Sequence, residues 1–198
     1  MNVRTLACGF AFAIACSHAD TAPPAAKPDP IASFETVKTV LQSPRCVNCH
    51  PTGDQPTQGD DGHVHPQFVT RGPDGKGAPG LACATCHGAA NPPASYGAHM
   101  PPGVATGWKL PPPEHKMVFA GMALGPLCEQ LKDQQRNGGK DLAALFKHVS
   151  SDPLVLWGWS PGYGRARVPI AHEEFVRAFK VWMDAGAPCA PAKTASLP

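Results

Sequence analysis

The stretch CVNCH at residues 46–50 is followed by the similar stretch CATCH at residues 83–87, and this repeat decides how the rest of the chain is interpreted. Each copy places two cysteines three positions apart and follows the second cysteine directly with a histidine. Only 32 residues lie between the two copies. Both copies therefore belong to one short part of the chain.

Three kinds of site use paired cysteines at this spacing. A zinc site made of four thiolates would leave both histidines unexplained. A thioredoxin-like redox pair needs one motif followed by a helix, and no helical pattern follows either copy. Covalent c-type haem uses every residue of the motif, because the two thiols attach the porphyrin and the histidine binds the iron. The sequence therefore predicts two c-type haems, held by Cys46, Cys49 and His50 and by Cys83, Cys86 and His87.

The composition agrees with a fold of few regular elements. The chain has 24 prolines and 20 glycines among 198 residues, about twice the ordinary share of these residues. Two rigid porphyrins would supply apolar surfaces on which such a chain could pack. Because the two motifs are so close, two single-haem domains in tandem do not fit. We expect a mainly α fold with much irregular Pro- and Gly-rich loop, that is, a compact multihaem c-type cytochrome with few short helices.

The N-terminus has the pattern of an export signal. Arg4 precedes an apolar run at residues 6–15, and small residues favour cleavage after Ala19. In the alternative, residues 1–15 are a lipoprotein signal and Cys16 becomes the lipidated first residue. Either signal predicts a periplasmic protein. Membrane attachment is expected only through a lipid at Cys16, because no later stretch is long and apolar enough to span a bilayer.

The charge balance disfavours a nucleic-acid partner. Removal of residues 1–19 takes away Arg4 and lowers the formal net charge from +2 to +1, whereas nucleic-acid binding requires a clustered basic face.

After the signal, the chain is expected to consist of a flexible linker at 20–30, a dihaem domain at 31–190 and a tail at 191–198. The dihaem domain is expected to have a haem-binding part at 31–115 and a helical part at 116–190.

Hydrophobic periodicity predicts four short helices, at residues 31–42, 126–134, 141–149 and 172–185. Ser33 is the expected N-cap of the first helix, whose apolar face we expect to cover the first haem. Asp141 is the expected N-cap of the third helix. The last helix carries an apolar stripe typical of a protein core. Three segments rich in turn residues are predicted to be irregular loops: 51–80, 91–113 and 155–165.

Two cysteines remain in the part of the chain that follows the motifs, Cys128 and Cys189. Thiols that serve no other purpose pair in an oxidising compartment. We therefore expect a disulfide between them, which would join the second predicted helix to the end of the last one. Two free buried thiols are the alternative.

Each iron has a sixth coordination position, which electron-transfer haems fill with His or Met. His65 is preferred for one iron because it lies in the loop between the motifs. His99 is preferred for the other iron. His63, Met100 and His115 are the alternatives, and Met100 would raise the potential of its haem. His148 and His172 lie at helical positions where a structural role is expected.

Several stretches resemble the bacterial cytochrome c-like proteins described as a subunit of isoquinoline 1-oxidoreductase. They are CVNCHPTGDQPTQGDDGHVHPQFVTRGPDGKG (46–77), GAHMPPG (97–103), LCEQLKDQQRNGGKDLAALFKHV (127–149) and DPLVLWGWSPGYGR (152–165). The similarity covers roughly residues 31–190. It implies c-type haem at the six motif residues, and a molybdenum hydroxylase or another dehydrogenase as redox partner.

These observations together predict an exported dihaem c-type cytochrome, an electron carrier between redox proteins and not an enzyme. One alternative is a haem enzyme or gas sensor with an open axial position, which would bind carbon monoxide when reduced. Another is the electron-transfer subunit of a larger dehydrogenase, which would purify together with its partner.

Overall fold

The structure is a computed structural model and describes residues 27–191. The predicted export signal, Cys16 as the alternative site of lipidation, the start of the linker and most of the tail lie outside the described residues. Within them, six short α-helices are present: α1 (Pro30–Leu41), α2 (Pro44–Val47), α3 (Leu124–Lys132), α4 (Leu142–Ser151), α5 (Pro153–Leu156) and α6 (His172–Asp184). In the described part of the chain, none of the helices has both the length and the apolar character that crossing a membrane would require.

Two small antiparallel hairpins follow the first motif. β1 (Thr57–Gln58) pairs with β2 (His63–Val64), and β3 (Gly77–Ala78) pairs with β4 (Leu81–Ala82). Four short 3₁₀ turns complete the regular structure: η1 (Cys83–Thr85), η2 (Ala94–Tyr96), η3 (Pro113–His115) and η4 (Trp157–Trp159). The predicted loops at 51–80 and 91–113 are therefore irregular apart from these short elements.

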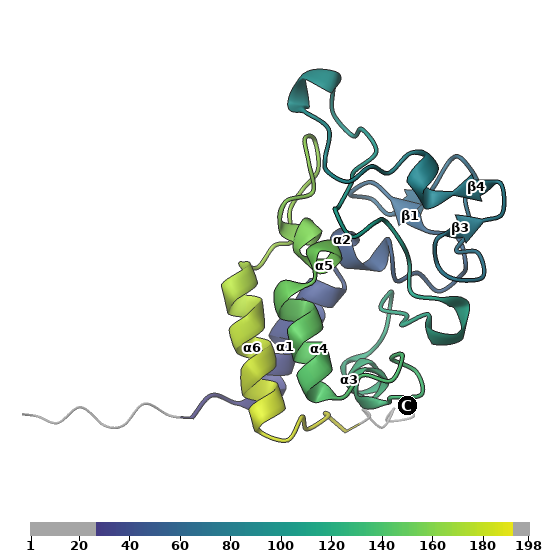
Figure 1. Cartoon of the computed structure of the whole chain (residues 1–198). Coiled ribbons are helices and arrows are strands. Elements are labelled where there is room, and N and C mark those ends of the chain that lie inside the picture. The colour runs from purple at the N-terminus through teal and green to yellow at the C-terminus, as the bar shows by residue number, and fades with distance from the viewer. Residues whose placement is uncertain (1–26, 192–198) are drawn as a thin grey trace, which may run out of the picture.

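The helices form a compact half of the molecule, and residues 51–123, which contain the two hairpins and the second motif, form an irregular half beside it (Figure 1). α1 packs against α6 and α3, and α4 packs against α6. The ring of Phe34 lies 4.7 Å from that of Trp182, centre to centre. Side chains at helical spacing from α1 and α6 fill the core: Phe34, Val37, Val40, Leu41, Phe175, Phe179 and Trp182.

Two features of α1 differ from the sequence expectations. Its apolar face is already buried against α6, where the first haem was expected, because the stripe of α6 offers a complementary apolar surface. The helix also begins earlier than expected, since the Asp29 carboxylate accepts a hydrogen bond from the Ile31 N–H and Pro30 occupies the first turn. Ser33 instead donates its hydroxyl to the Asp29 carbonyl.

The predicted loop at 155–165 begins with helical structure. Asp152 caps α5 by accepting a hydrogen bond from the Leu154 N–H at 2.9 Å. Pro153 follows at the first helical position, where a missing N–H costs nothing. The aromatic residues of η4 come directly after this turn. The segment therefore packs against α4.

The irregular half is held together by backbone contacts that require glycine. Gly75 has φ +81°, and a side chain there would collide with the Leu110 carbonyl. The Leu110 N–H donates to the Gly75 carbonyl at 2.8 Å. Residues 71–77 are thereby joined to the segment that leads into η3.

A disulfide closes the helical half. The Sγ atoms of Cys128 and Cys189 are 1.98 Å apart, across a sequence separation of 61 residues. Cys128 lies on α3 and is fully buried. The bridge fixes the chain that leaves α6 against α3.

Candidate functional site

The first motif lies on and just after α2. The His50 N–H donates to the Cys46 carbonyl at 3.0 Å, so the backbone wraps the motif into one turn. The thiols of Cys46 and Cys49 form no disulfide. Burial raises the pKa of Cys46 to about 11 and that of Cys49 to about 12. Such thiols stay protonated at neutral pH, unlike the low-pKa thiolate of a redox-active pair.

The imidazole of His50 is fixed at two points. Its Nδ1 lies 2.6 Å from the Met117 carbonyl oxygen, and its ring stacks on Phe119 with centres 3.9 Å apart. Burial lowers the pKa of His50 to about 4. The ring is therefore neutral at physiological pH, with Nδ1–H as donor and Nε2 left with a free lone pair.

The second motif lies on η1 in the irregular half. The His87 N–H donates to the Cys83 carbonyl at 3.0 Å, which gives the same turn as in the first motif. The Cys83 and Cys86 thiols also form no disulfide, and Cys86 is exposed. The second motif is therefore more open to solvent than the first motif.

The imidazole of His87 is held in the same way as that of His50. Its Nδ1 lies 2.8 Å from the Pro102 carbonyl oxygen, and its ring is parallel to that of Trp108 with centres 4.6 Å apart. Burial lowers the pKa of His87 as well. Nε2 is again left as the lone-pair nitrogen.

This shared arrangement is what a haem-binding motif requires. A histidine that binds a metal usually donates its other ring N–H to a carbonyl or carboxylate, which fixes the tautomer and the ring orientation. Both motif histidines do so, through carbonyls that lie 67 and 15 residues away in sequence. The residues present therefore fit c-type haem at both motifs, with two unbridged thiols beside each prepared imidazole.

His65 faces the second motif. Its ring centre lies 6.5 Å from that of His87. Its Nδ1 is buried and, among the described residues, has no hydrogen-bond partner. Two imidazoles that bind one metal from opposite sides, through bonds of about 2.0–2.1 Å, have ring centres about 6 Å apart. The placement of this loop histidine therefore suits the iron of the second motif.

The other predicted ligands have different surroundings. His63 is exposed, with its two ring nitrogens bonded to Asp61 and Gln58. His99 is exposed, and its backbone N–H donates to the Tyr163 carbonyl. The Met100 carbonyl accepts a hydrogen bond from Arg165. His115 has a buried Nδ1 without a hydrogen-bond partner in the described part of the chain.

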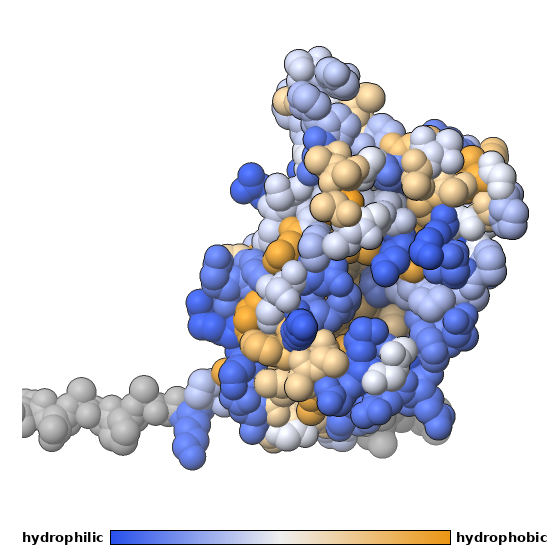
Figure 2. All heavy atoms as spheres, viewed as in Figure 1, coloured by the Kyte–Doolittle hydropathy of each residue, from blue (hydrophilic) through white to orange (hydrophobic). Residues whose placement is uncertain are grey.

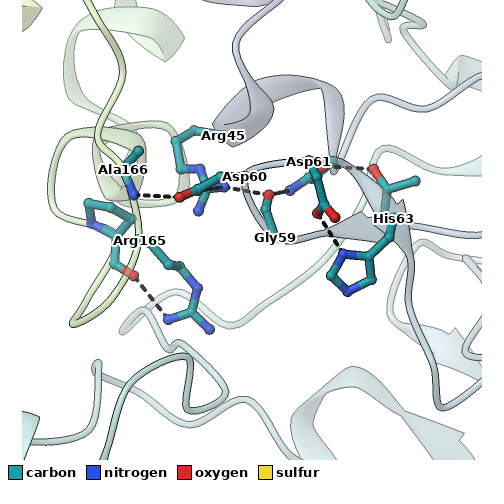
Figure 3. Close-up of polar contacts among 10 residues, drawn as sticks. Arg45, Gly59, Asp60, Asp61, His63, Arg165 and Ala166 are labelled. Carbon is teal, nitrogen blue, oxygen red and sulfur yellow. Dashed lines mark hydrogen bonds and ion pairs between the residues drawn. The ribbon is translucent and has the colours of Figure 1, made fainter.

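Arg45 links the first motif to two distant loops (Figure 3). Its side chain is only 2% exposed, and its guanidinium donates to the Asp60 carboxylate at 2.7 Å and to the Gly59 carbonyl at 2.6 Å. The second oxygen of Asp60 accepts from the Ala166 N–H at 3.1 Å. A cation beside Cys46 is therefore buried and neutralised by its own carboxylate.

A chain of packed side chains connects the two motifs. Trp108, which stacks on His87, meets Trp157 edge to face with ring centres 4.8 Å apart. The guanidinium of Arg45 lies 5.8 Å from the centre of the Trp157 ring. Arg45 directly precedes Cys46, so the contacts run from one motif to the other. The two motifs thus belong to one packed unit.

A second buried arginine lies near the first motif. Arg71 is fully buried. Its guanidinium donates to the Asp54 carboxylate at 3.3 Å and to the carbonyls of Gly53 and Pro111. Lys116 shares the same carboxylate at 2.9 Å. Two cations therefore share one anion in this group, which leaves a net positive charge.

Apolar side chains reach the surface of the irregular half. Figure 2 shows apolar residues at the surface over the β3–β4 hairpin. Large apolar side chains that are exposed in the described residues all lie outside the α-helices, at Val64, Phe68, Tyr96, Met100 and Tyr163. An apolar cofactor in the irregular half would find surfaces to cover.

A bare-metal site does not form from the motif residues. Across residues 27–191, no group of three or more His, Cys, Asp or Glu side chains is arranged to hold a metal ion. The four thiolates of a zinc site are therefore not brought together.

Comparison of the chain with protein-family models, with curated proteins and with solved structures finds no match.

Proposed function

We propose that the protein is an exported c-type cytochrome with two covalent haems, which transfers electrons between redox partners. The observation that carries the proposal is the matched state of the two motif histidines. Each is held at Nδ1 by a carbonyl and stacked on an aromatic ring. The residues that would hold the haems are Cys46, Cys49 and His50 for the first and Cys83, Cys86 and His87 for the second.

The haem irons would supply one-electron redox chemistry, and the chain's own residues would supply position and environment. The carbonyls of Met117 and Pro102 keep the proton on Nδ1 of each histidine. Phe119 and Trp108 restrict rotation of the rings. A fixed ligand keeps structural change small when the charge of the metal changes, which favours electron transfer.

The position of His65 favours a carrier over a haem enzyme. An enzyme needs an open coordination position for its substrate, whereas an electron carrier has both axial positions filled. His65 stands 6.5 Å from His87, ring centre to ring centre. It can serve as the sixth ligand of the second iron. That would close the more exposed of the two haem sites to small ligands.

The partner is expected to be a redox protein with a basic surface. Four ionised haem propionates would change the net charge from +1, after loss of residues 1–19, to about −3. Negative charge at exposed haem edges would attract a basic patch. A molybdenum hydroxylase or another dehydrogenase is the candidate partner in the periplasm. A lipid at Cys16 would add membrane attachment.

The test compares His65→Ala with His63→Ala in the reduced, haem-loaded protein. We expect the wild-type protein to bind no carbon monoxide and the His65→Ala variant to bind one molecule per chain, because its second iron loses a ligand. His63→Ala serves as the matched control and should behave as the wild type does. Rapid, stoichiometric carbon monoxide binding by the wild-type second haem would instead support an enzyme or a gas sensor.

A further inference from the structure

We propose that Gln130 is a positioning residue for the first motif. It holds residues 116–119, which we call the clamp, in a strained conformation against the ring of His50. The proposal rests on the proposed function, since the clamp would set the orientation of a histidine that binds iron. Gln130 would act through the clamp and not by binding the iron itself.

The clamp contacts His50 at three points. The Met117 carbonyl oxygen lies 2.6 Å from Nδ1, and the Phe119 ring stacks on the imidazole with centres 3.9 Å apart. The backbone N–H of Phe119 also donates to the His50 carbonyl at 3.1 Å. The clamp therefore fixes both the ring and the backbone of His50. A hydrogen bond from Nδ1–H makes a histidine a stronger donor to its metal, so a displaced clamp would change the potential of the iron.

The backbone of the clamp is strained at Met117. Its φ of +49° lies in the left-handed region, which residues with a side chain rarely adopt. Strained conformations of this kind persist only where surrounding contacts enforce them. The φ angle of Met117 also sets the direction of its own carbonyl relative to the preceding chain. Relaxation to an ordinary conformation would therefore move the acceptor away from Nδ1 of His50.

Gln130 supplies a buried contact at the centre of the clamp. It lies on α3 and is 3% exposed. Its Nε2 donates to the Val118 carbonyl at 2.7 Å, and its Oε1 accepts from the Arg136 guanidinium at 2.9 Å. Because arginine can only donate, Arg136 determines which end of the amide faces the clamp. The donor is thereby directed at the residue between Met117 and Phe119.

The two ends of the clamp are held by other side chains. Gln42, directly after α1, donates to the Phe119 carbonyl at 3.2 Å and to the Met122 carbonyl at 2.7 Å. Lys116 pairs with the Asp54 carboxylate at 2.9 Å, and more than half of the Asp54 side chain is exposed. Contacts that are open to water contribute less than a buried hydrogen bond. We therefore expect removal of Gln130 to displace the clamp most.

The experiment compares Gln130→Met with Asn137→Leu in the full haem-loaded chain, after a haem count on each protein. Asn137 is also 3% exposed, and it donates to the carbonyls of Leu131 and Lys140, which lie outside the clamp. Each variant replaces a buried amide by an apolar side chain of similar size. Asn137→Leu therefore controls for a purely structural loss.

We expect Gln130→Met to raise the midpoint potential of one haem and to alter the electron paramagnetic resonance signal of the same haem. The cause would be a weaker bond at Nδ1, which makes His50 a poorer donor to ferric iron. The ring N–H of His50 should exchange with solvent about 5-fold faster, the factor that one ordinary hydrogen bond represents. The ring N–H of His87 is the internal control. Asn137→Leu should lower stability and leave these three signals unchanged.

Two further variants test the strain and keep the experiment decisive. Glycine adopts a positive φ at little cost. In a Met117→Gly background, Gln130→Met should therefore shift the potential less than it does in the wild-type background. If Gln130→Met folds poorly, Gln42→Leu releases the partly exposed end of the clamp. It should raise the same potential by a smaller amount.

Three results would overturn the assignment: unchanged potentials and ring N–H exchange in Gln130→Met, equal shifts in Gln130→Met and Asn137→Leu, or an undiminished shift in the Met117→Gly background. In each case two attached haems would leave the proposed function standing. A wild-type chain without haem would instead refute the proposed function.

Discussion

The two motifs have the same five-residue pattern but different surroundings. The first lies on α2, against the core of the helical half, and the pKa of its thiols is raised to about 11 and about 12 by burial. The second lies on η1 in the irregular half, where Cys86 is exposed. The pattern determines which bonds a motif can form, whereas the chain packed around it determines stability and potential.

The aromatic partners show the same contrast. Phe119, which stacks on His50, is 6% exposed and belongs to the hydrophobic core. Trp108, which stacks on His87, is only half-buried. Substitutions at the first site should therefore destabilise the helices. Substitutions at the second site should destabilise only the surrounding irregular half.

The largest expected effect comes from removing one haem at a time. Cys46→Ser with Cys49→Ser should lower the free energy of unfolding by about 5 kcal/mol, a large part of the stability of a typical domain, because a haem bound at the first motif would adjoin the helical core, against which Cys46 packs. Cys83→Ser with Cys86→Ser should leave the helices folded. Urea unfolding followed by circular dichroism measures both. Equal losses would contradict the difference between the sites.

A second comparison removes the stacked rings. Phe119→Ala should cost about 3–5 kcal/mol, as expected for a buried phenyl ring, whereas Trp108→Ala should cost less because its site is partly open to water. Trp108→Ala should nevertheless alter the electron paramagnetic resonance signal of the second haem, since the His87 ring becomes free to turn. A larger stability loss in Trp108→Ala would reverse the predicted order.

The disulfide belongs to the helical half alone. Replacing both Cys128 and Cys189 by Ser should lower the free energy of unfolding by about 2–4 kcal/mol, because the unfolded chain loses a long covalent loop. The spectra of both haems should not change. Thermal unfolding together with visible spectra tests this. Altered haem spectra would show that the bridge also supports the sites.

The smallest predicted effect concerns the buried cation near the first motif. Arg71→Met should lower the potential of the first haem by about 40 mV, on the order of 1 kcal/mol across roughly 10 Å, because positive charge favours the reduced iron. Arg71→Lys keeps the charge and is the matched control. Spectroelectrochemical titration measures both haems. A shift confined to the second haem would contradict the placement of this charge.

Local signals predict much of the helical half. Asp141 marks the start of α4, where its carboxylate accepts from the Ala144 N–H. The spacing of Phe175, Phe179 and Trp182 marks the buried face of α6. The packing partner of α1 was not predicted correctly. An apolar stripe indicates that one face of a helix is buried, but it does not identify the surface that covers this face.

The site is predictable only in its local part. The spacing within each motif identifies its thiols and its histidine. The carbonyls of Met117 and Pro102 come from irregular segments, whose paths depend on glycine conformations and long-range contacts.

The most direct test is a haem count on the chain purified from cells that mature c-type cytochromes. A pyridine haemochrome assay, combined with the intact mass, should find two haems per chain, each retained after denaturation because it is bound through thioether bonds. A colourless protein with the mass of its amino acids alone would contradict the account.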